Sequence, residues 1–157
     1  MSSSVNPKDI KEIFIVPIGM VHSPYKERGP FQGKYSDEIC EVEVFPEYQE
    51  GLKDIETCSH LILLYWLDRA RRDVLQTRTP HSTEIHGVFA TRSPNRPNPI
   101  GFGVVRLIER KENILKVIGL DALDGTPVID IKPYSSELDA VLDARIGWIG
   151  GYKGLGY

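Results

Sequence analysis

Several features that mark common classes of protein are missing from this sequence. Cysteine is scarce, since Cys40 and Cys58 are the only two among 157 residues. With no C-x-x-C motif and no paired histidines, they argue against a disulfide framework and against a zinc site. The longest apolar run, residues 61–67, is far shorter than the about 18 residues of a membrane helix, and the first residues lack the apolar core of a signal peptide. We therefore expect a cytoplasmic protein with no metal and no membrane partner.

The sequence also lacks the glycine-rich motifs that hold most nucleotide-like cofactors. It contains no P-loop, no G-x-S-x-G and no G-x-G-x-x-G. Gly101 and Gly103 come closest, but Val-Val-Arg follows them, without a third glycine or a helical pattern. A cofactor that contains a nucleoside must therefore be bound by a device other than the strand–turn–helix unit of Rossmann folds.

Lysine is absent from residues 69–110, where eight arginines stand against three acidic residues. Residues 37–56 have the opposite balance, with eight acidic residues and one lysine. The net charge of −3 therefore hides two regions of opposite sign. Guanidinium groups bind phosphate through two hydrogen bonds and stack on bases, so the arginine-rich region favours RNA as a partner. The alternative is a solvated surface whose two charged regions pair in the fold.

Helical periodicity is rare in this chain, whereas short β-rich stretches are frequent. Residues 39–45 alternate apolar and acidic side chains, which predicts a half-buried strand. The apolar run 60–67 predicts a strand that is buried on both faces. So many short strands indicate a mainly β fold, a single small antiparallel β-barrel with one or two short helices, or else a sandwich. Further strands are expected at 13–21, 86–91, 102–109, 114–120 and 128–131, a hairpin turn at 110–113, and short helices at 46–53 and 68–75.

The chain has the length of one domain. We expect a disordered lead-in at residues 1–12, a barrel domain at 13–137 and a tail at 138–157. The end of the tail is rich in glycine and tyrosine and contains Trp148. This composition predicts either a flexible arm or a segment that docks on a partner subunit.

The most informative stretch is GVFATRSPNRPNPIG, residues 87–101. A strand is expected to end there, at the start of a loop with prolines at positions 94, 97 and 99. Each proline fixes its own φ and restricts the residue before it, so the loop is held extended at low entropy. Such a loop is either a stiff connector or a frame that places polar side chains for binding. Those side chains are Arg92, Asn95, Arg96 and Asn98.

Three other stretches carry polar residues beside turn-forming glycine or proline. In LDALDGTPVIDIKPY, residues 120–134, Asp121 and Asp124 are candidates for catalytic acids, a metal pair or turn caps. Residues 23–33 form a loop shaped by glycine and proline. The dipeptide Asp68-Arg69 follows the buried run and, taken alone, indicates an ordinary salt bridge.

In their order along the chain, four motifs resemble the TsaA-like, TrmO-type family of tRNA methyltransferases. The resemblance runs over residues 13–135, and its last two motifs are long and unusual. It implies a β-barrel homodimer that binds S-adenosylmethionine and methylates N6 of threonylcarbamoyladenosine at position 37 of tRNA, in particular of threonine tRNAs. The motifs are VHSPYKE (21–27), ETCSHLILLYW (56–66), ATRSPNRPNPIG (90–101) and LDALDGTPVIDIKPY (120–134).

The resemblance also implies which residues bind the cofactor. Two positions depart from the family pattern, since many members have Pro-Arg-Gln around the position of Phe31 and bacterial members often have His in place of Asp68. These departures bear on how the cofactor or the RNA is held. The implied cofactor-binding residues are Pro30, Phe31, Gln32, Asp68, Arg69, Arg92, Phe102, Leu123, Asp124, Gly125 and Thr126.

The acceptor nitrogen N6 is a weak nucleophile, because its lone pair is conjugated into the adenine ring. We hypothesise that the side-chain carbonyl of Asn95 or Asn98 positions the acceptor by accepting the N6 hydrogen. Arg92 would bind a carboxylate of the cofactor or of the modified base. The alternatives are another acceptor for the same cofactor, a non-catalytic cofactor sensor, and an RNA-binding module. Contacts with RNA phosphates are expected from Arg71, Arg72, Arg78 and Arg96.

Overall fold

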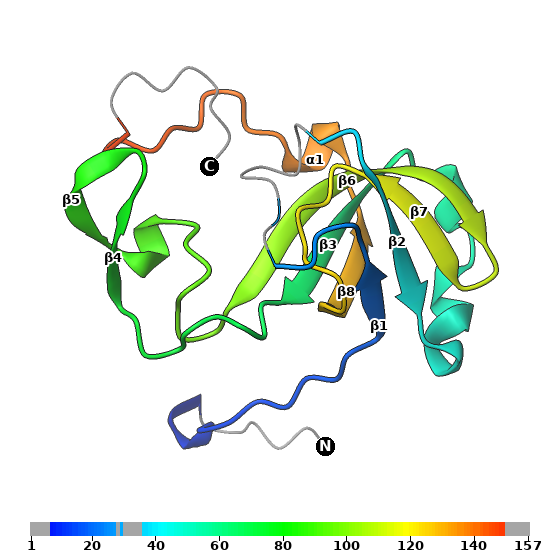
Figure 1. Ribbon diagram of the computed structural model, residues 1–157, viewed down its shortest axis with the longest axis horizontal. Coiled ribbons are helices and arrows are strands. Elements are labelled where there is room, and N and C mark those ends of the chain that lie inside the picture. The colour runs from blue at the N-terminus through cyan, green and yellow to red at the C-terminus, as the bar shows by residue number, and fades with distance from the viewer. Residues whose placement is uncertain (1–6, 28, 30–35, 150–157) are drawn as a thin grey trace.

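A computed structural model describes residues 7–27, 29 and 36–149 of the chain. Six strands close into a barrel in the order β1-β2-β7-β6-β3-β8, and neighbouring strands are antiparallel. Strands β4 and β5 form a separate two-stranded hairpin that projects from the barrel (Figure 1). The predicted fold class, a mainly β chain built on one small antiparallel barrel, is therefore confirmed.

Most elements are short, and the longest strand is β6. The barrel strands are β1 (Gly19–His22), β2 (Ile39–Val44), β3 (His60–Trp66), β6 (Ile100–Lys111), β7 (Ile114–Ile118) and β8 (Pro127–Pro133). The hairpin consists of β4 (Gln76–Thr79) and β5 (Ser82–Gly87). The helical segments are α1 (Ser136–Asp139) and the 3-10 turns η1 (Pro7–Asp9), η3 (Pro46–Leu52), η4 (Ile55–Thr57) and η5 (Val88–Ala90).

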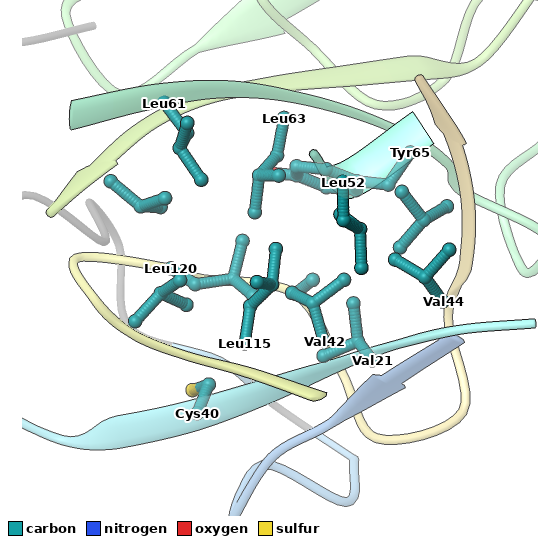
Figure 2. Packing of buried hydrophobic residues seen from close by; sticks show 14 residues of the cluster. Val21, Cys40, Val42, Val44, Leu52, Leu61, Leu63, Tyr65, Leu115 and Leu120 are labelled. Carbon is teal, nitrogen blue, oxygen red and sulfur yellow. The ribbon is translucent and has the colours of Figure 1, made fainter. Parts of the chain in front are cut away.

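Alternation along the strands fills the barrel interior with apolar side chains (Figure 2). Burial, followed by the charges of Glu38 and Asp121, raises the pKa of the Cys40 thiol to about 11, as expected of a packing residue. Tyr65 brings a hydroxyl group to the inward face of β3. The inward residues of β2 and β3 are Cys40, Val42, Val44, Leu61, Leu63 and Tyr65, each at most 3% exposed.

The β6–β7 connection and the extent of several strands follow the sequence predictions. The stretches 39–45, 60–67 and 114–120 contain β2, β3 and β7, and the stretch 128–131 lies within β8. The predicted turn at 110–113 joins β6 to β7, and Glu112 there has a φ of 55°, in the left-handed region typical of tight turns.

Two predicted strands are shorter in the structure than expected. The stretch 13–21 joins β1 only from Gly19 onward, and Ile13 and Phe14 are 80% and 88% exposed. Pro17 has no N–H to donate to a neighbouring strand, which opposes pairing before it. The stretch 86–91 leaves the strand after Gly87 and continues as the 3-10 turn η5.

The predicted helix at 68–75 is wrong, because this stretch is a series of turns and bends. The N–H of Arg71 donates to Asn95 Oδ1 at 2.9 Å, and its carbonyl accepts from the N–H of Arg96 at 3.0 Å. An α-helix would need the same groups for its own bonds between residues i and i−4. Bonds to a distant loop therefore take the place of the helix.

The chain after α1 runs back to the β4–β5 hairpin (Figure 1). Trp148 stacks on His86 with ring centroids 4.1 Å apart, and its indole N–H donates to the Ala90 carbonyl at 3.0 Å. This part of the predicted tail therefore docks on its own chain, while residues 150–157 lie outside the described residues. The predicted lead-in is described from Pro7, where η1 begins. Within the described ranges, no helix is long and apolar enough to cross a membrane.

Candidate functional site

A cleft of about 1000 Å³ opens where β3 ends and β6 begins. This volume is at the upper end of the range of small-molecule sites, about 300–1,000 Å³. Residues that are distant in the sequence form its walls. They come from stretches 65–70, 77–80, 91–98, 100–102 and 121–126.

The proline loop, residues 91–99, is held in place by two arginines. Arg96 Nη1 donates to the carbonyl oxygens of Thr91 at 3.0 Å and Ser93 at 3.1 Å. Arg72 Nε donates to the Pro97 carbonyl at 2.8 Å. A loop rich in proline has few N–H groups of its own, so these guanidinium groups satisfy its carbonyls. Arg72 and Arg96, which were expected to contact RNA, therefore also shape the loop.

The two asparagines of the proline loop line the cleft and contact the same arginine-rich stretch. Asn95 Oδ1 accepts a hydrogen bond from the N–H of Arg71 at 2.9 Å. Asn98 Oδ1 accepts one from Arg72 Nη2 at 3.2 Å. An amide oxygen has two lone pairs, so each side chain retains the capacity for one more hydrogen bond.

The aspartate turn, residues 120–126, is bound to the loop that follows β1. The Ser23 N–H donates to Asp124 Oδ1 at 3.0 Å, and the Ser23 hydroxyl donates to the Ala122 carbonyl at 2.8 Å. Lys26 Nζ donates to Asp124 Oδ2 at 2.7 Å. The hydrogen bonds from Lys26 and from the Ser23 amide hold the pKa of Asp124 below its usual range. Of the three roles open to Asp124, the structure therefore supports that of a turn cap.

The backbone amides of the aspartate turn are used inside the protein. The N–H groups of Asp124, Gly125 and Thr126 donate to the carbonyls of Tyr25, Val21 and Leu123, respectively. Gly125 has a φ of 83°, which favours glycine. These bonds fix the shape of the turn, and Leu123 and Thr126 line the cleft.

At the inner end of the aspartate turn, Asp121 meets Tyr65. Asp121 Oδ1 accepts a hydrogen bond from the Tyr65 hydroxyl, and both residues line the cleft. Burial raises the pKa of Asp121 above its usual range, although the Tyr65 hydrogen bond and the Arg92 charge oppose the shift. Burial, together with the Asp121 charge, also raises the pKa of Tyr65. Tyr65 therefore stays protonated beside a carboxylate that takes up a proton more readily than an exposed one.

Two glycines make room for this pair. Gly101 lies opposite Tyr65 in the β3–β6 register, and a Cβ at Gly101 would lie 2.2 Å from Tyr65 Cε2. A Cβ at Gly29 would lie 2.4 Å from the carbonyl oxygen of Asp121. Because a real Cβ does not approach other atoms this closely, glycine at both positions allows the pair to adopt its geometry.

Arg92 and Phe102 place a cation beside an aromatic ring in the cleft. The Arg92 guanidinium carbon lies 5.4 Å from the centroid of the Phe102 ring, and Phe102 is 46% exposed. The Arg92 charge also acts on both Tyr65 and Asp121. The cleft therefore combines a cation, an aromatic face and a carboxylate, which together suit a ligand with an anionic group and a flat ring.

The structure brings most of the predicted site residues together. Arg71 lies outside the cleft lining and pairs with Asp73 at 3.0 Å, and Arg72, Asp124 and Gly125 are also not part of the lining. Pro30, Phe31 and Gln32 lie outside the described residues. The predicted residues that line the cleft are Asp68, Arg69, Arg78, Arg92, Asn95, Arg96, Asn98, Phe102, Leu123 and Thr126.

Sequence reasoning missed Tyr65 and, apart from Arg78, the β4–β5 hairpin as parts of the site. Tyr65 lies within the apolar run, and the available signal was its position two residues beyond Leu63 on the same inward face. The hairpin contributes Thr77, Thr79 and Pro80 to the cleft, but its strands show no apolar alternation. Among the described residues, no group of three or more His, Cys, Asp and Glu side chains is arranged to hold a metal ion.

Comparisons with known proteins agree with this geometry. A probable S-adenosyl-L-methionine-binding protein of Archaeoglobus fulgidus is 64% identical over 133 residues, which are 83% of this chain and 36% of that protein. A second protein of this organism, an S-adenosyl-L-methionine-binding protein, is 53% identical over 131 residues, 82% of this chain and 94% of its own length. The crystal structure of TrmO from Pseudomonas aeruginosa has a TM-score of 0.72 at 38% identity, over 87% of this chain and 62% of that chain.

The chain spans about a third of the length of the first of these relatives and less than two thirds of the Pseudomonas protein. The family model of the tRNA-methyltransferase O N-terminal domain matches residues 20–140, a range that includes the proline loop, the aspartate turn and Tyr65. This chain therefore belongs to the family of the tRNA-methyltransferase O N-terminal domain.

Proposed function

We propose that this chain binds S-adenosylmethionine in the cleft and transfers its methyl group to N6 of threonylcarbamoyladenosine at position 37 of tRNA. Threonine tRNAs are the first substrates to test. The proposal depends on one observation: Tyr65, Arg92 and Asp121, from three separate family motifs, line one cleft of small-molecule size. The names of the two Archaeoglobus relatives, which state that they bind S-adenosyl-L-methionine, support the choice of donor.

The polar and aromatic groups of the cleft suit this donor. Arg92 would hold the donor carboxylate through charge-assisted hydrogen bonds. Phe102, with its half-exposed ring, would pack against the adenine. Leu123 and Thr126 would line the remaining wall beside them. When bound, the sulfonium group supplies an electrophilic methyl carbon.

The chain's own contribution to methyl transfer is mainly one of positioning. The proline loop, held by Arg72 and Arg96, keeps Asn95 and Asn98 at the cleft. The remaining lone pair of either amide oxygen would accept a hydrogen bond from the acceptor base and orient N6 toward the methyl carbon. A stiff loop loses little entropy when it makes this contact.

Arginines around the cleft would bind the tRNA backbone. Arg69 Nη1 donates to the Lys26 carbonyl at 3.0 Å, and Arg78 Nη1 donates to the Thr83 carbonyl at 3.1 Å. Each guanidinium group has five N–H donors, so both retain donors for phosphate. We expect tRNA affinity to fall steeply with salt, and each arginine removed from the interface to reduce the slope of log K against log salt by about one. An affinity that does not change with salt would exclude this interface.

The active form is proposed to be a cytoplasmic homodimer. Large apolar side chains are exposed at both ends of the described chain, and a second copy would cover such surfaces. Light scattering coupled to size exclusion chromatography tests this, with a monomeric mass as the contrary result. The exposed residues are Ile13, Phe14, Leu138 and Leu142, each at least 80% exposed.

Two measurements test the proposed activity together. Mass spectrometry of nucleosides from tRNA incubated with the protein and methyl-labelled donor should detect one labelled methyl on threonylcarbamoyladenosine. Calorimetry should show that Arg92→Ala weakens donor binding by about tenfold to a hundredfold, the effect of losing a charge-assisted hydrogen bond pair. Arg106→Ala, on an exposed position of β6 outside the cleft lining, is the matched control.

The outcomes separate this proposal from the competing functions. A protein that binds the donor but yields no methylated nucleoside is a cofactor sensor. If the protein methylates a different nucleoside, the proposed donor site stands and the proposed acceptor is wrong. A protein that binds tRNA and shows no heat with the donor is an RNA-binding module.

A further inference from the structure

Asp121 has no role in the donor and tRNA binding proposed above, although it lines the cleft. Asp124, three residues later, binds Lys26 and the Ser23 amide and caps the turn. Asp121 instead accepts a hydrogen bond from the hydroxyl of Tyr65, on the inward face of β3. Gly101 and Gly29 allow this pair to pack closely. A partly buried carboxylate that lines a cleft beside a buried hydroxyl is a candidate for a functional group.

Methylation at N6 replaces an N–H bond by an N–C bond, so a proton must leave the nitrogen. Asn95 and Asn98 can accept a hydrogen bond, but an amide oxygen does not hold a proton near neutral pH. Arg92 is permanently charged and cannot accept a proton. Among the described residues of the cleft, Asp68 and Asp121 are the carboxylates. Asp121 is the one whose position is fixed by a buried tyrosine.

We propose that Asp121 is the proton acceptor of the methyl transfer and that Tyr65 is its positioning residue. This inference rests on the proposed function. The new bond joins N6 to the methyl carbon while the carbon–sulfur bond breaks and its electron pair stays on sulfur. The N6 proton passes to Oδ2 of Asp121, because Oδ1 accepts the Tyr65 hydroxyl.

The surroundings of Asp121 suit this role. A general base is most effective when its pKa lies close to the working pH, and burial shifts the pKa of Asp121 upward, in that direction. Three influences limit the shift, so the carboxylate stays available as a base: the Tyr65 hydroxyl on β3, a backbone hydrogen bond at Asp121 itself and the charge of Arg92 in the proline loop. The third ionisable group that interacts with Asp121 in the described chain is the Cys40 thiol on β2, which is buried and protonated at neutral pH.

Two isosteric variants test the roles of Asp121 and Tyr65. Asp121→Asn should lower the single-turnover methylation rate by about 100-fold or more, the usual contribution of a general base. Its donor affinity by calorimetry should stay within about twofold of wild type, because the base contacts the acceptor. Asp130→Asn, which removes an ion pair with Lys132 at 2.9 Å, is the control for a lost carboxylate outside the cleft.

Tyr65→Phe provides a readout that does not depend on turnover. The Tyr65 hydrogen bond lowers the pKa of Asp121, so its removal should raise that pKa. Carbon-detected NMR titration of the Asp121 carboxyl group would measure the change directly. The acidic limb of the methylation rate profile should move to higher pH by the same amount.

The results distinguish this inference from the function on which it rests. If wild-type protein binds the donor and methylates no tRNA, the proposed function fails and the base role fails with it. If wild type is active and Asp121→Asn keeps its rate within about threefold, the base role alone is wrong. A loss of donor affinity equal to the loss of rate would assign Asp121 to donor binding and would also overturn the inference.

Discussion

The inner and outer ends of the aspartate turn show how differently one fold can use the same side chain. Asp121, at the inner end, is partly buried and accepts a hydrogen bond from Tyr65, and its pKa is raised. Asp124, at the outer end, binds Lys26 and the Ser23 amide, and its pKa is lowered. The two carboxylates are three residues apart, yet one opposes the stability of the fold at neutral pH and the other contributes to it.

The direction of the pKa shift therefore distinguishes a carboxylate kept for function from one that stabilises the fold. A turn cap improves the folded state, so losing it should always cost stability. A partly buried carboxylate whose pKa is raised is retained at a cost in stability, which is typical of functional sites. The contrast can be tested from both ends of the turn.

The largest loss of stability is expected from a substitution at Gly101, which lies against Tyr65 at the inner end of the aspartate turn. In Gly101→Ala, the new Cβ would lie 2.2 Å from the Tyr65 ring, so the ring must shift and its hydrogen bond to Asp121 is disturbed. We expect a loss of about 2–4 kcal/mol in the free energy of unfolding, from overpacking and from the weakened hydrogen bond of a partly buried carboxylate. Urea titration measures this loss.

Gly103→Ala, on the same strand, is the matched control for that variant. A Cβ there would lie 3.8 Å from Tyr65 Cε1, an ordinary contact distance. Its stability should equal or slightly exceed that of wild type, because alanine costs less backbone entropy than glycine in a strand. Equal losses from both variants would show that the tight packing of Tyr65 is not the cause.

The second effect concerns Ser23, which connects the turn to the loop after β1. Ser23→Ala removes the 2.8 Å hydrogen bond to the Ala122 carbonyl, which lies in the buried part of the turn. The unfolding free energy should fall by about 1–2 kcal/mol, because a buried acceptor loses its partner. Ser59→Ala, at an exposed serine that contacts His60, should change it by less than about 0.5 kcal/mol. A Ser23→Ala variant as stable as wild type would mean that other bonds fix the turn.

How much of the barrel can be predicted depends on whether local pattern or distant contact decides the structure. The alternation in residues 39–45 specifies which face of β2 is buried, because a one-residue shift would turn its glutamates inward. The apolar run 60–67 predicts the strand β3 but does not specify which of its faces points inward. The stretch 68–75 has a helical spacing, but its backbone groups bind Asn95 and Arg96 instead. The local spacing of residues does not reveal a hydrogen-bond partner that is distant in the sequence, so it predicts a helix here.

In the candidate site, too, some residues could be predicted from local sequence and others depend on distant contacts. Arg92 and Phe102 could be proposed from their motif, and they lie together in the cleft. Tyr65 could not, because its role depends on the register that sets it opposite Gly101 and on the turn that brings Asp121 to its hydroxyl. Both conditions arise from strand pairing between residues far apart in the sequence.

The third prediction compares the two carboxylates directly through the pH dependence of stability. A raised pKa in the folded state means that stability falls as pH rises from about 4, the unfolded value, through the folded pKa. Asp121→Asn should therefore be at least as stable as wild type at pH 7, with a difference that shrinks toward pH 4. Melting temperatures between pH 4 and pH 8 measure this.

Asp124→Asn should behave in the opposite way. The lowered pKa of Asp124 contributes stability above the unfolded value of about 4, and this contribution is lost as pH falls through the folded pKa. The variant should melt below wild type at pH 7, and the gap should close only in acid. If both variants melt lower than wild type by the same amount at pH 7, Asp121 is a structural residue like Asp124.

The smallest effect is expected for Lys26→Met, which removes the exposed partner of Asp124 at the outer end. The Ser23 amide still binds Asp124 Oδ1, so the melting temperature should fall less than in Asp124→Asn. An exposed ion pair is screened by salt, so the difference from wild type should vanish in about 1 M salt. In an Asp124→Asn background, Lys26→Met should have no further effect, whereas Lys53→Met controls for loss of a lysine elsewhere. A loss that persists in high salt would show that Lys26 acts through its aliphatic stem rather than through its charge.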